Sequence, residues 1–286
     1  MDNKRNPWEV VKASVIGAAH VRRKMPNQDR ISTSQDAPTK AKDKASRPTV
    51  LAVADGHGSA KYVRSGQGAE FAVLAACRVA ADELSISSDF SNSTVDEIVS
   101  HFKTKVFNTW LTDINDFTTK HPFTPEELES LNEKVREDLM QNPRKAYGCT
   151  LLLVICYDDM VITLQLGDGN ILLLYDDGRV EYTDELAGEP GEETDSLCTV
   201  QSPHEIKHHI FKGSELPVLA TVSSDGLYKS FEYDAEFLKI PQTCYDALRA
   251  NDFQAQPVED IIEAFLRTVT DNGAGDDTTL GIIFRK

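Results

Sequence analysis

The sequence predicts an α+β protein built on antiparallel sheets. Residues 147–157 and 160–166 are strongly apolar segments of strand length, joined by a short turn at Asp158-Asp159. A further strand at 170–175 turns back through an Asp-Asp-Gly sequence into 179–182. Strands joined by such short turns pair antiparallel, because a parallel connection needs a crossover of about a dozen or more residues. Helical patterns lie before and after this block rather than between its strands, which favours the α+β class over α/β.

The N-terminal half combines short strands with helices. Two helix starts have capping signals: Thr94 pairs with Glu97 in a capping box, and Thr124 precedes a proline in the first turn. Regularly spaced apolar residues predict how far each helix continues. The elements that we expect here are strands at 13–19, 31–34 and 50–54 and helices over 63–84, 94–114 and 124–139.

The segment 183–211 is acidic, then histidine-bearing, and is unusually long for a plain connection. It is either a functional flap or a disordered insert, and we expect a loop that contacts substrate. His204, His208 and His209 could also be interpreted as a zinc site, but no cysteine pair supports that interpretation. After this segment the pattern predicts a strand at 217–222, helices at 234–250 (interrupted near Pro241) and 257–270, and a final strand at 278–284. No repeat or linker divides the chain, so we expect a single domain over 1–286.

The composition argues against several classes of function. Of 286 residues, 40% are hydrophobic and 27% charged, a balance that supports a full core. The net charge of −16 argues against binding nucleic acid or an anionic membrane, and allows a phosphorylated substrate only with a cation in the site. Five cysteines without metal-type spacing suit a reducing compartment. No apolar run approaches the ~20 residues of a membrane span. We expect a monomeric, cytoplasmic protein.

The strand at 50–54 runs directly into Asp55-Gly56-His57-Gly58. The aspartate offers hard oxygen ligands, and the histidine can move a proton near neutral pH. Glycine lets the backbone turn sharply and lets its carbonyl approach a ligand closely. The alternative is an ordinary Asp-Gly hairpin turn.

Aspartates recur at the ends of strands. Asp55, Asp168 and Asp225 each stand beside glycine where an apolar segment ends, and Asp276-Asp277 precedes the last strand. Carboxylates gathered at one end of a sheet would repel one another without a cation. Oxygen ligands without cysteine or histidine suit Mg²⁺ or Mn²⁺, and two such ions about 4 Å apart can share a carboxylate. The alternative is four independent turns.

Six motifs in order make the sequence resemble the metal-dependent protein serine/threonine phosphatases of the 2C type (the PPM family), and its bacterial single-domain members above all. The resemblance covers nearly the whole chain and implies a four-layer sandwich, with two central antiparallel sheets and helices on both outer faces. The motifs are Asn27-Gln28-Asp29, Val53-Ala54-Asp55-Gly56-His57-Gly58, Gly148-Cys149-Thr150, Gly167-Asp168-Gly169, Ser224-Asp225-Gly226-Leu227 and Asp276-Asp277-Thr278-Thr279.

The resemblance implies a metal site for two Mg²⁺ or Mn²⁺ ions. Asp55 would bridge both ions, and the carbonyl of Gly56 would bind one of them. Asp225 and Asp276 would complete the shell of the other ion. Asp168 resembles the family's acid that supports a weaker third ion.

The resemblance also implies catalytic roles. His57 would protonate the leaving seryl or threonyl oxygen, the alternative being an ordinary turn histidine. Asp29 would hydrogen-bond a metal-bound water. Lys24 stands where the family often has an arginine that grips the phosphate, and lysine cannot make the same bidentate contact. Arg22 or Arg23 could serve instead.

The function that we expect is hydrolysis of phosphoserine and phosphothreonine on proteins by metal-activated water, without a phosphoenzyme. The substrate would be a phosphorylated protein, and the enzyme would be paired with a serine/threonine kinase. Lys24 and Gln28 depart from the family pattern, and Gln28 removes a negative charge near the second ion. These departures support an alternative, a non-catalytic module that binds phosphoproteins or a kinase. A phosphatase of small metabolites is a further alternative.

Overall fold

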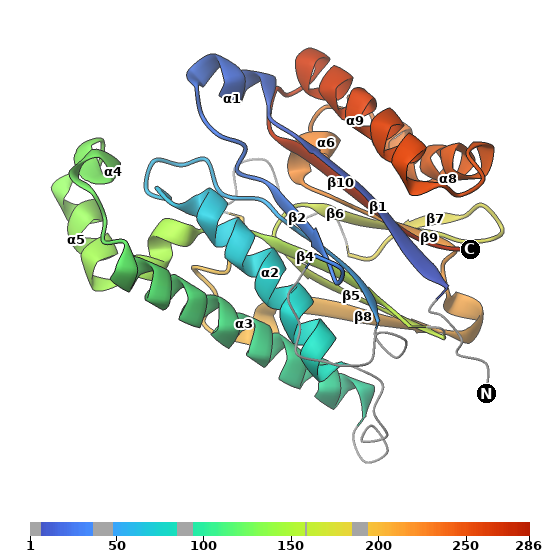
Figure 1. Cartoon of the computed structure of the whole chain (residues 1–286), viewed down its shortest axis with the longest axis horizontal. Helices are drawn as coiled ribbons and strands as arrows, with labels where there is room; N and C mark the ends of the chain where they lie inside the picture. The colour runs from blue at the N-terminus through green and yellow to red at the C-terminus, as the bar shows by residue number, and fades with distance from the viewer. Residues whose placement is uncertain (1–6, 37–47, 85–93, 158, 185–193) are drawn as a thin grey trace.

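Two five-stranded antiparallel sheets form the centre of the protein (Figure 1). The computed structural model describes residues 7–36, 48–84, 94–157, 159–184 and 194–286. In spatial order, the first sheet contains β1 (Trp8–Val15), β10 (Thr278–Arg285), β9 (Leu219–Ser223), β6 (Asn170–Leu174) and β7 (Val180–Tyr182). The second sheet contains β2 (Arg30–Thr33), β3 (Thr49–Ala54), β4 (Leu151–Cys156), β5 (Met160–Leu166) and β8 (Lys207–Lys212).

Helices cover the outer face of each sheet (Figure 1). The long helices α2 (Ser65–Glu83) and α3 (Val95–Lys120) pack on the second sheet, and α8 (Ile240–Ala250) and α9 (Ala255–Asn272) pack on the first. The shorter helices are α1 (Ala18–Arg23), α4 (Pro125–Glu129), α5 (Glu133–Gln141), α6 (Asp225–Tyr228) and α7 (Asp234–Phe237), with single 3₁₀ turns η2 (Pro143–Tyr147), η3 (Pro203–Glu205) and η4 (Gly213–Glu215).

Alternating side chains of β4 show why the sheets are buried on both faces. Leu151 and Leu153 belong to the core beneath α2 and α3, whereas Leu152 and Val154 belong to the core between the two sheets. Successive residues of a strand point to opposite faces, so a continuously apolar strand fits a sheet covered on both sides. The predicted α+β class and the four-layer sandwich are confirmed.

Several element boundaries differ from the prediction. The strand predicted at 13–19 ends at Val15, and the chain then forms α1. The helix predicted over 124–139 is two helices, because Asn132 starts a second one by accepting a hydrogen bond from the backbone NH of Val135 (3.0 Å). The capping box of Thr94 and Glu97 is present as predicted.

The predicted flap is partly a strand. Within 183–211, residues 185–193 lie outside the described part of the chain, as does Asp158 of the turn between β4 and β5. The segment ends in β8, which pairs with β5 at the edge of the second sheet. His208 contacts Asp96, and the neighbouring His209 contacts Asp184 (3.4 and 3.2 Å). Neighbouring side chains of a strand point to opposite faces of the sheet, so His208 and His209 do not converge on one zinc ion.

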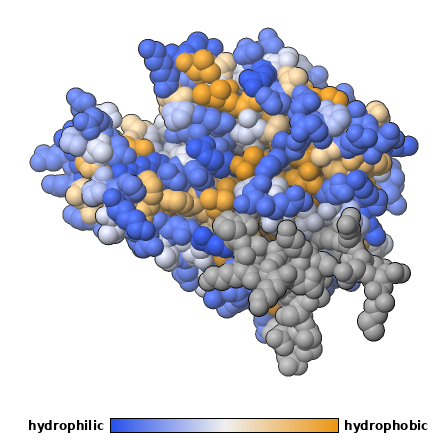
Figure 2. Space-filling model, viewed as in Figure 1, coloured by the Kyte–Doolittle hydropathy of each residue, from blue (hydrophilic) through white to orange (hydrophobic). Residues whose placement is uncertain are grey.

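The face shown in Figure 2 is mostly hydrophilic, with small apolar patches between the polar residues. This agrees with a net charge of −16. None of the helices in the described residues has the length and apolar character that crossing a membrane requires.

Candidate active site

The acidic residues predicted for the site meet at one end of the sandwich, around a cavity of about 430 Å³. β3 leads to it from the second sheet, and β9 and β10 flank it from the first. Six of the eight residues that the sequence predicts for the site line this cavity: Asp55, Gly56, His57, Asp168, Asp225 and Asp276. The other two, Asp29 and Lys24, do not line it.

Asp55 is held at the end of β3 by its backbone. Its NH donates to the Thr150 hydroxyl, and its carbonyl accepts from the Thr150 NH, both at 2.9 Å. A side chain on the following residue, Gly56, would place its Cβ 2.7 Å from the backbone of Ser65, so only glycine fits. Burial raises the pKa of Asp55 well above its usual range, and the nearby charges of Asp29 and Asp225 raise it further. The ionised carboxylate of Asp55 therefore needs a nearby cation to offset its charge.

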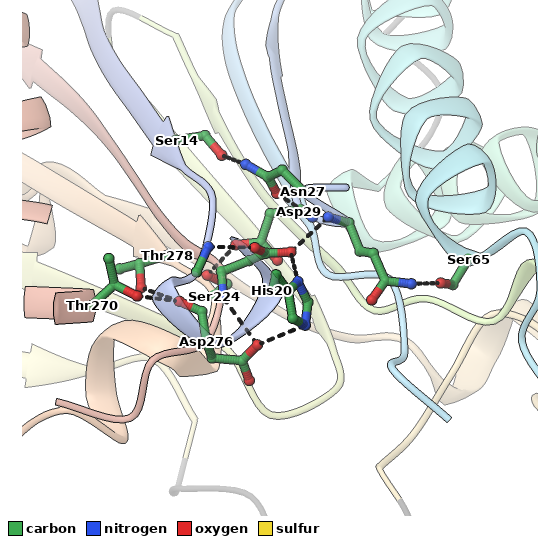
Figure 3. A network of polar contacts seen from close by, with 12 residues as sticks. Ser14, His20, Asn27, Asp29, Ser65, Ser224, Thr270, Asp276 and Thr278 are labelled. Carbon is green, nitrogen blue, oxygen red and sulfur yellow. Dashed lines mark hydrogen bonds and ion pairs between the residues drawn. The ribbon is translucent and has the colours of Figure 1, made fainter. Parts of the chain in front are cut away.

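Asp29 lies beneath the cavity and is only 2% exposed. Its Oδ2 accepts a hydrogen bond from the Ser224 hydroxyl at 2.6 Å, whereas its Oδ1 is buried without a hydrogen-bond partner (Figure 3). Burial raises the pKa of Asp29 to about 7. The Ser224 hydroxyl also accepts from the Thr279 NH at 3.0 Å, so this carboxyl is tied to both β9 and β10.

Asp225 begins α6 and is 7% exposed. Its Oδ2 forms an ion pair with Lys229, and its Oδ1 is buried without a hydrogen-bond partner. The next residue, Gly226, packs so closely that a Cβ would lie 2.1 Å from the carbonyl oxygen of Asp277. This close contact brings the Ser-Asp-Gly motif against the Asp276-Asp277 turn.

Asp168 lies in the turn between β5 and β6, after Gly167, whose φ is +106°. Its Oδ2 accepts from the Thr194 hydroxyl at 2.9 Å. Burial and the charge of Asp225 raise the pKa of Asp168, and Thr194 and Lys229 act in the opposite direction. Asp168 and Asp225 both line the cavity, and their negative charges act on each other there.

Two residues without a predicted role, His20 and Asp277, support this arrangement. His20 on α1 is 8% exposed, with Nδ1 2.8 Å from Asp277 and Nε2 3.7 Å from Asp276 (Figure 3 shows the contact with Asp276). Asp277 is buried and accepts hydrogen bonds from the backbone NH groups of Gly17 (2.7 Å) and Gln28 (2.6 Å). The paired acids in the sequence give a signal for Asp277, but no pattern marks His20, whose position depends on the unpredicted α1.

An arginine and a lysine line the cavity, and neither of them is Lys24. Lys24 is exposed and ends α1 with a φ of +57°, outside the cavity lining. Arg23 lines the cavity, whereas Arg22 lines a separate depression beside α9. Lys229, to which the sequence analysis gave no role, also lines the cavity.

The donor set suits a hard divalent cation. Among the residues that the structure describes, no three His, Cys, Asp or Glu side chains form a complete set of metal ligands. Buried oxygens of Gln28, Asp29 and Asp225 nevertheless lack hydrogen-bond partners, and Asp55 lies among other carboxyls. Hard oxygen donors with no thiolate among them fit Mg²⁺ or Mn²⁺.

The fold and the site together define a class of protein, the four-layer α+β sandwich with acidic residues gathered at one end of its two sheets. The chain belongs to the protein phosphatase 2C family, whose sequence profile matches residues 16–267. No curated protein matches the chain.

Solved structures with the same fold include bacterial proteins. PppA, described as a key regulatory component of T6SS in Pseudomonas aeruginosa, matches with a TM-score of 0.61 and 15% identity over 98% of each chain. The S. agalactiae serine/threonine phosphatase matches with a TM-score of 0.58 and 17% identity, over 98% of this chain and 100% of that one. The catalytic domain of the serine/threonine phosphatase PstP, in complex with two manganese ions, matches with a TM-score of 0.56 and 15% identity over 97% of each chain.

Proposed function

We propose that this protein is a Mg²⁺- or Mn²⁺-dependent phosphatase that hydrolyses phosphoserine and phosphothreonine on proteins. The observation that carries the proposal is the meeting of Asp55, Asp168, Asp225 and Asp276, from four distant parts of the chain, around one cavity. Membership of the protein phosphatase 2C family supports it, as does the fold shared with a phosphatase whose complex contains two manganese ions.

The chain's own carboxyls and one carbonyl would hold the ions: Asp55, Gly56, Asp225 and Asp276, with Asp168 at the edge of the site. When bound, the ions supply an activated water and offset the charge of the phosphoryl oxygens. The roles at the reacting atoms would fall to His57 and Asp29.

His57 would donate a proton in the reaction, and Asp29 would accept a hydrogen bond. His57 lines the cavity, its ring 4.9 Å from that of Tyr62, and would protonate the leaving seryl or threonyl oxygen. The unpartnered Oδ1 of Asp29 would accept a hydrogen bond from the attacking water. Arg23 rather than Lys24 is the basic residue of α1 that would face the phosphate, because Arg23 lines the cavity.

A covalent cysteine mechanism does not suit this site. Cys149 lies in the segment that holds Asp55, but it is fully buried, and burial raises the pKa of its thiol well above the usual value. A nucleophilic cysteine needs a thiolate at working pH. Direct attack by water, without a phosphoenzyme, fits the residues present.

The substrate would be a phosphorylated protein supplied by a serine/threonine kinase, and the enzyme would act as a cytoplasmic monomer. A phosphatase of small metabolites would instead hydrolyse sugar phosphates and leave phosphopeptides intact. Parallel assays on a phosphothreonine peptide and on glucose 6-phosphate separate these two substrate classes.

Hydrolysis of p-nitrophenyl phosphate tests the metal-dependent reaction. We expect activity with Mn²⁺, its loss in EDTA, and a fall of at least about 100-fold in Asp225→Asn, because a carboxylate ligand is removed. The matched control is Asp246→Asn on the exposed side of α8, which should keep full activity. Activity that is unchanged in EDTA would contradict the proposed dependence on a divalent metal ion.

A second candidate function is a non-catalytic binding module. The neutral Gln28 at the cavity favours it. The side-chain amide of Gln28 donates a hydrogen bond to the Ser65 hydroxyl at 2.6 Å. Similarity to PppA, a protein described as a regulatory component, is compatible with it. Calorimetric titration with Mn²⁺ distinguishes the candidates, because a module without catalysis should bind the ion weakly or not at all.

A further inference from the structure

One corner of the cavity already contains a positive charge. The ammonium group of Lys229 forms an ion pair with Oδ2 of Asp225, and both residues line the cavity together with Asp168. The family resemblance implies a third metal ion beside Asp168 at this corner. Which cation occupies this corner matters for the proposed metal-dependent function, on which the role of Lys229 rests.

Helix geometry places the lysine there. Asp225 is the first residue of α6, and Lys229 is its C-cap, one turn later. The NH of Lys229 donates to the carbonyl of Asp225 at 2.9 Å, which closes that turn. Residues four apart lie on the same side of a helix, so the lysine side chain returns to the carboxyl that begins the helix. The side chain of Lys229 is 53% exposed, whereas that of Asp225 is 9% exposed. The flexible stem therefore lies at the rim and its ammonium reaches the buried acid.

The other acids of the corner also act on this ammonium. Although partial burial works against it, the pKa of Lys229 is raised by Asp225, Asp168 and Asp276. In return, Lys229 counteracts the rise in the pKa of Asp168 that burial and Asp225 cause. Lys229 is ion-paired with Asp225 and lines the same cavity as Asp168.

We propose that Lys229 is a covalently attached counter-cation that replaces the third ion Asp168 would otherwise help to hold, so that the protein binds two divalent ions and not three. An ammonium offsets one negative charge and brings three hydrogen-bond donors, but it carries no exchangeable water ligands. Lys229 would thus stabilise the Asp168–Asp225 corner at any metal concentration. Its role is to position the ligand Asp225, and it takes no part in proton transfer.

The number of bound ions tests this directly, by titration calorimetry with Mn²⁺ and by metal analysis after equilibrium dialysis. We expect two ions per chain in the wild type and three in Lys229→Asp, because the substitution removes the ammonium and adds a third carboxylate to the corner. Adding Asp168→Asn to that variant should return the number to two. Lys239→Asp, the same charge change at an exposed residue outside the cavity lining, should bind two. Far-UV circular dichroism verifies that each variant is folded.

Lys229→Met separates this role from a grip on the substrate phosphate. The methionine keeps most of the stem and removes the charge, so the metal-free variant should unfold at a lower temperature than the wild type, and Mn²⁺ should stabilise it more. A raised KM with two ions and unchanged thermal stability would instead make Lys229 a phosphate contact and overturn the inference. Three ions in the wild type, or two in Lys229→Asp, would also overturn it. A wild type that binds no Mn²⁺ would contradict the proposed function itself, which is a separate result.

Discussion

Three acids at or beside the cavity are held by the protein through Oδ2 of their carboxyl groups. Oδ2 of Asp29 accepts from Ser224, Oδ2 of Asp168 accepts from Thr194, and Oδ2 of Asp225 pairs with Lys229. In Asp29 and Asp225 the other oxygen is buried without a hydrogen-bond partner. Leaving such an oxygen unpaired costs free energy, so the protein fixes the orientation of these two carboxyls and leaves one oxygen of each for a ligand.

The raised pKa of Asp29 predicts how the metal-free protein responds to pH. Between 3.8, the ordinary value, and about 7, the folded state holds a proton that the unfolded state releases. Stability from this group is therefore present at low pH and is lost as the pH rises toward 7. In EDTA, we expect the melting temperature of the wild type to fall more steeply between pH 5 and about 7 than that of Asp29→Asn. Thermal melts by circular dichroism measure both profiles, and parallel curves would contradict the assignment.

At the scale of elements, one buried arginine joins the start of α2 to α4. Arg64 is 8% exposed and donates to both carboxyl oxygens of Glu127, at 2.7 and 2.8 Å. It also donates to the His121 carbonyl and to the Tyr147 hydroxyl, and its guanidinium lies 4.4 Å from the ring centre of Phe123. Because α2 begins directly after Arg64, this network anchors the helix whose first residue packs against Gly56.

Removing this anchor should destabilise the protein strongly. In Arg64→Met, Glu127 loses its partner, and we expect a loss of about 3 kcal/mol in the free energy of unfolding. The control is Arg78→Met, which removes a pair with Asp113 of the same 2.7 Å length whose arginine is 36% exposed. That change should cost less than about 1 kcal/mol. Urea denaturation gives both values, and equal losses would mean that burial does not set the strength of the Arg64 network.

Capping residues and apolar periodicity predict the long elements. They do not predict the break between two helices or a polar edge strand. The capping box at Thr94 predicted the start of α3, whereas the second cap at Asn132 went unnoticed, and with it the break between α4 and α5. β8 reads as polar because it is an edge strand with exposed residues, so its pattern resembled a loop.

The acids of the site could be predicted because each stands beside one end of a strand, and strand ends are visible in the sequence. Asp55 and Asp225 follow β3 and β9, whereas Asp276 precedes β10, and all three line the cavity. The cations could not be predicted in the same way. Lys24 lies outside the cavity because α1 ends there in a left-handed turn, and Lys229 lies inside it because α6 turns back on its first residue. Neither short helix has an apolar pattern long enough to detect.

At the scale of the whole molecule, the site depends on how the two sheets pack. β3 belongs to one sheet and β9 and β10 to the other, so the spacing between sheets sets the distance between Asp55 and the acids opposite. A Cβ on Gly281 of β10 would lie 2.7 Å from the side chain of Leu51 on β3. Such close packing holds the two sheets at a fixed spacing.

This shared core predicts that the sandwich unfolds as one unit, in keeping with the single domain that the sequence predicts. The chain has two tryptophans, in different layers. Trp8 lies between the sheets and donates to the carbonyl of Tyr157 (2.7 Å), whereas Trp110 on α3 donates to that of Gly68 (3.0 Å) in the outer core. In Trp110→Phe and in Trp8→Phe, fluorescence therefore reports one layer at a time.

Within each variant, we expect the urea midpoint from fluorescence to coincide with the midpoint from far-UV circular dichroism, because a cooperative transition gives every probe the same curve. Comparing two probes in the same protein removes the effect of the substitution on stability. If Trp110 reported unfolding at a lower urea concentration than circular dichroism does in Trp8→Phe, the α2–α3 layer would separate from the sheets first. Because the first turn of α2 packs against Gly56, that result would also place the loss of the site before global unfolding.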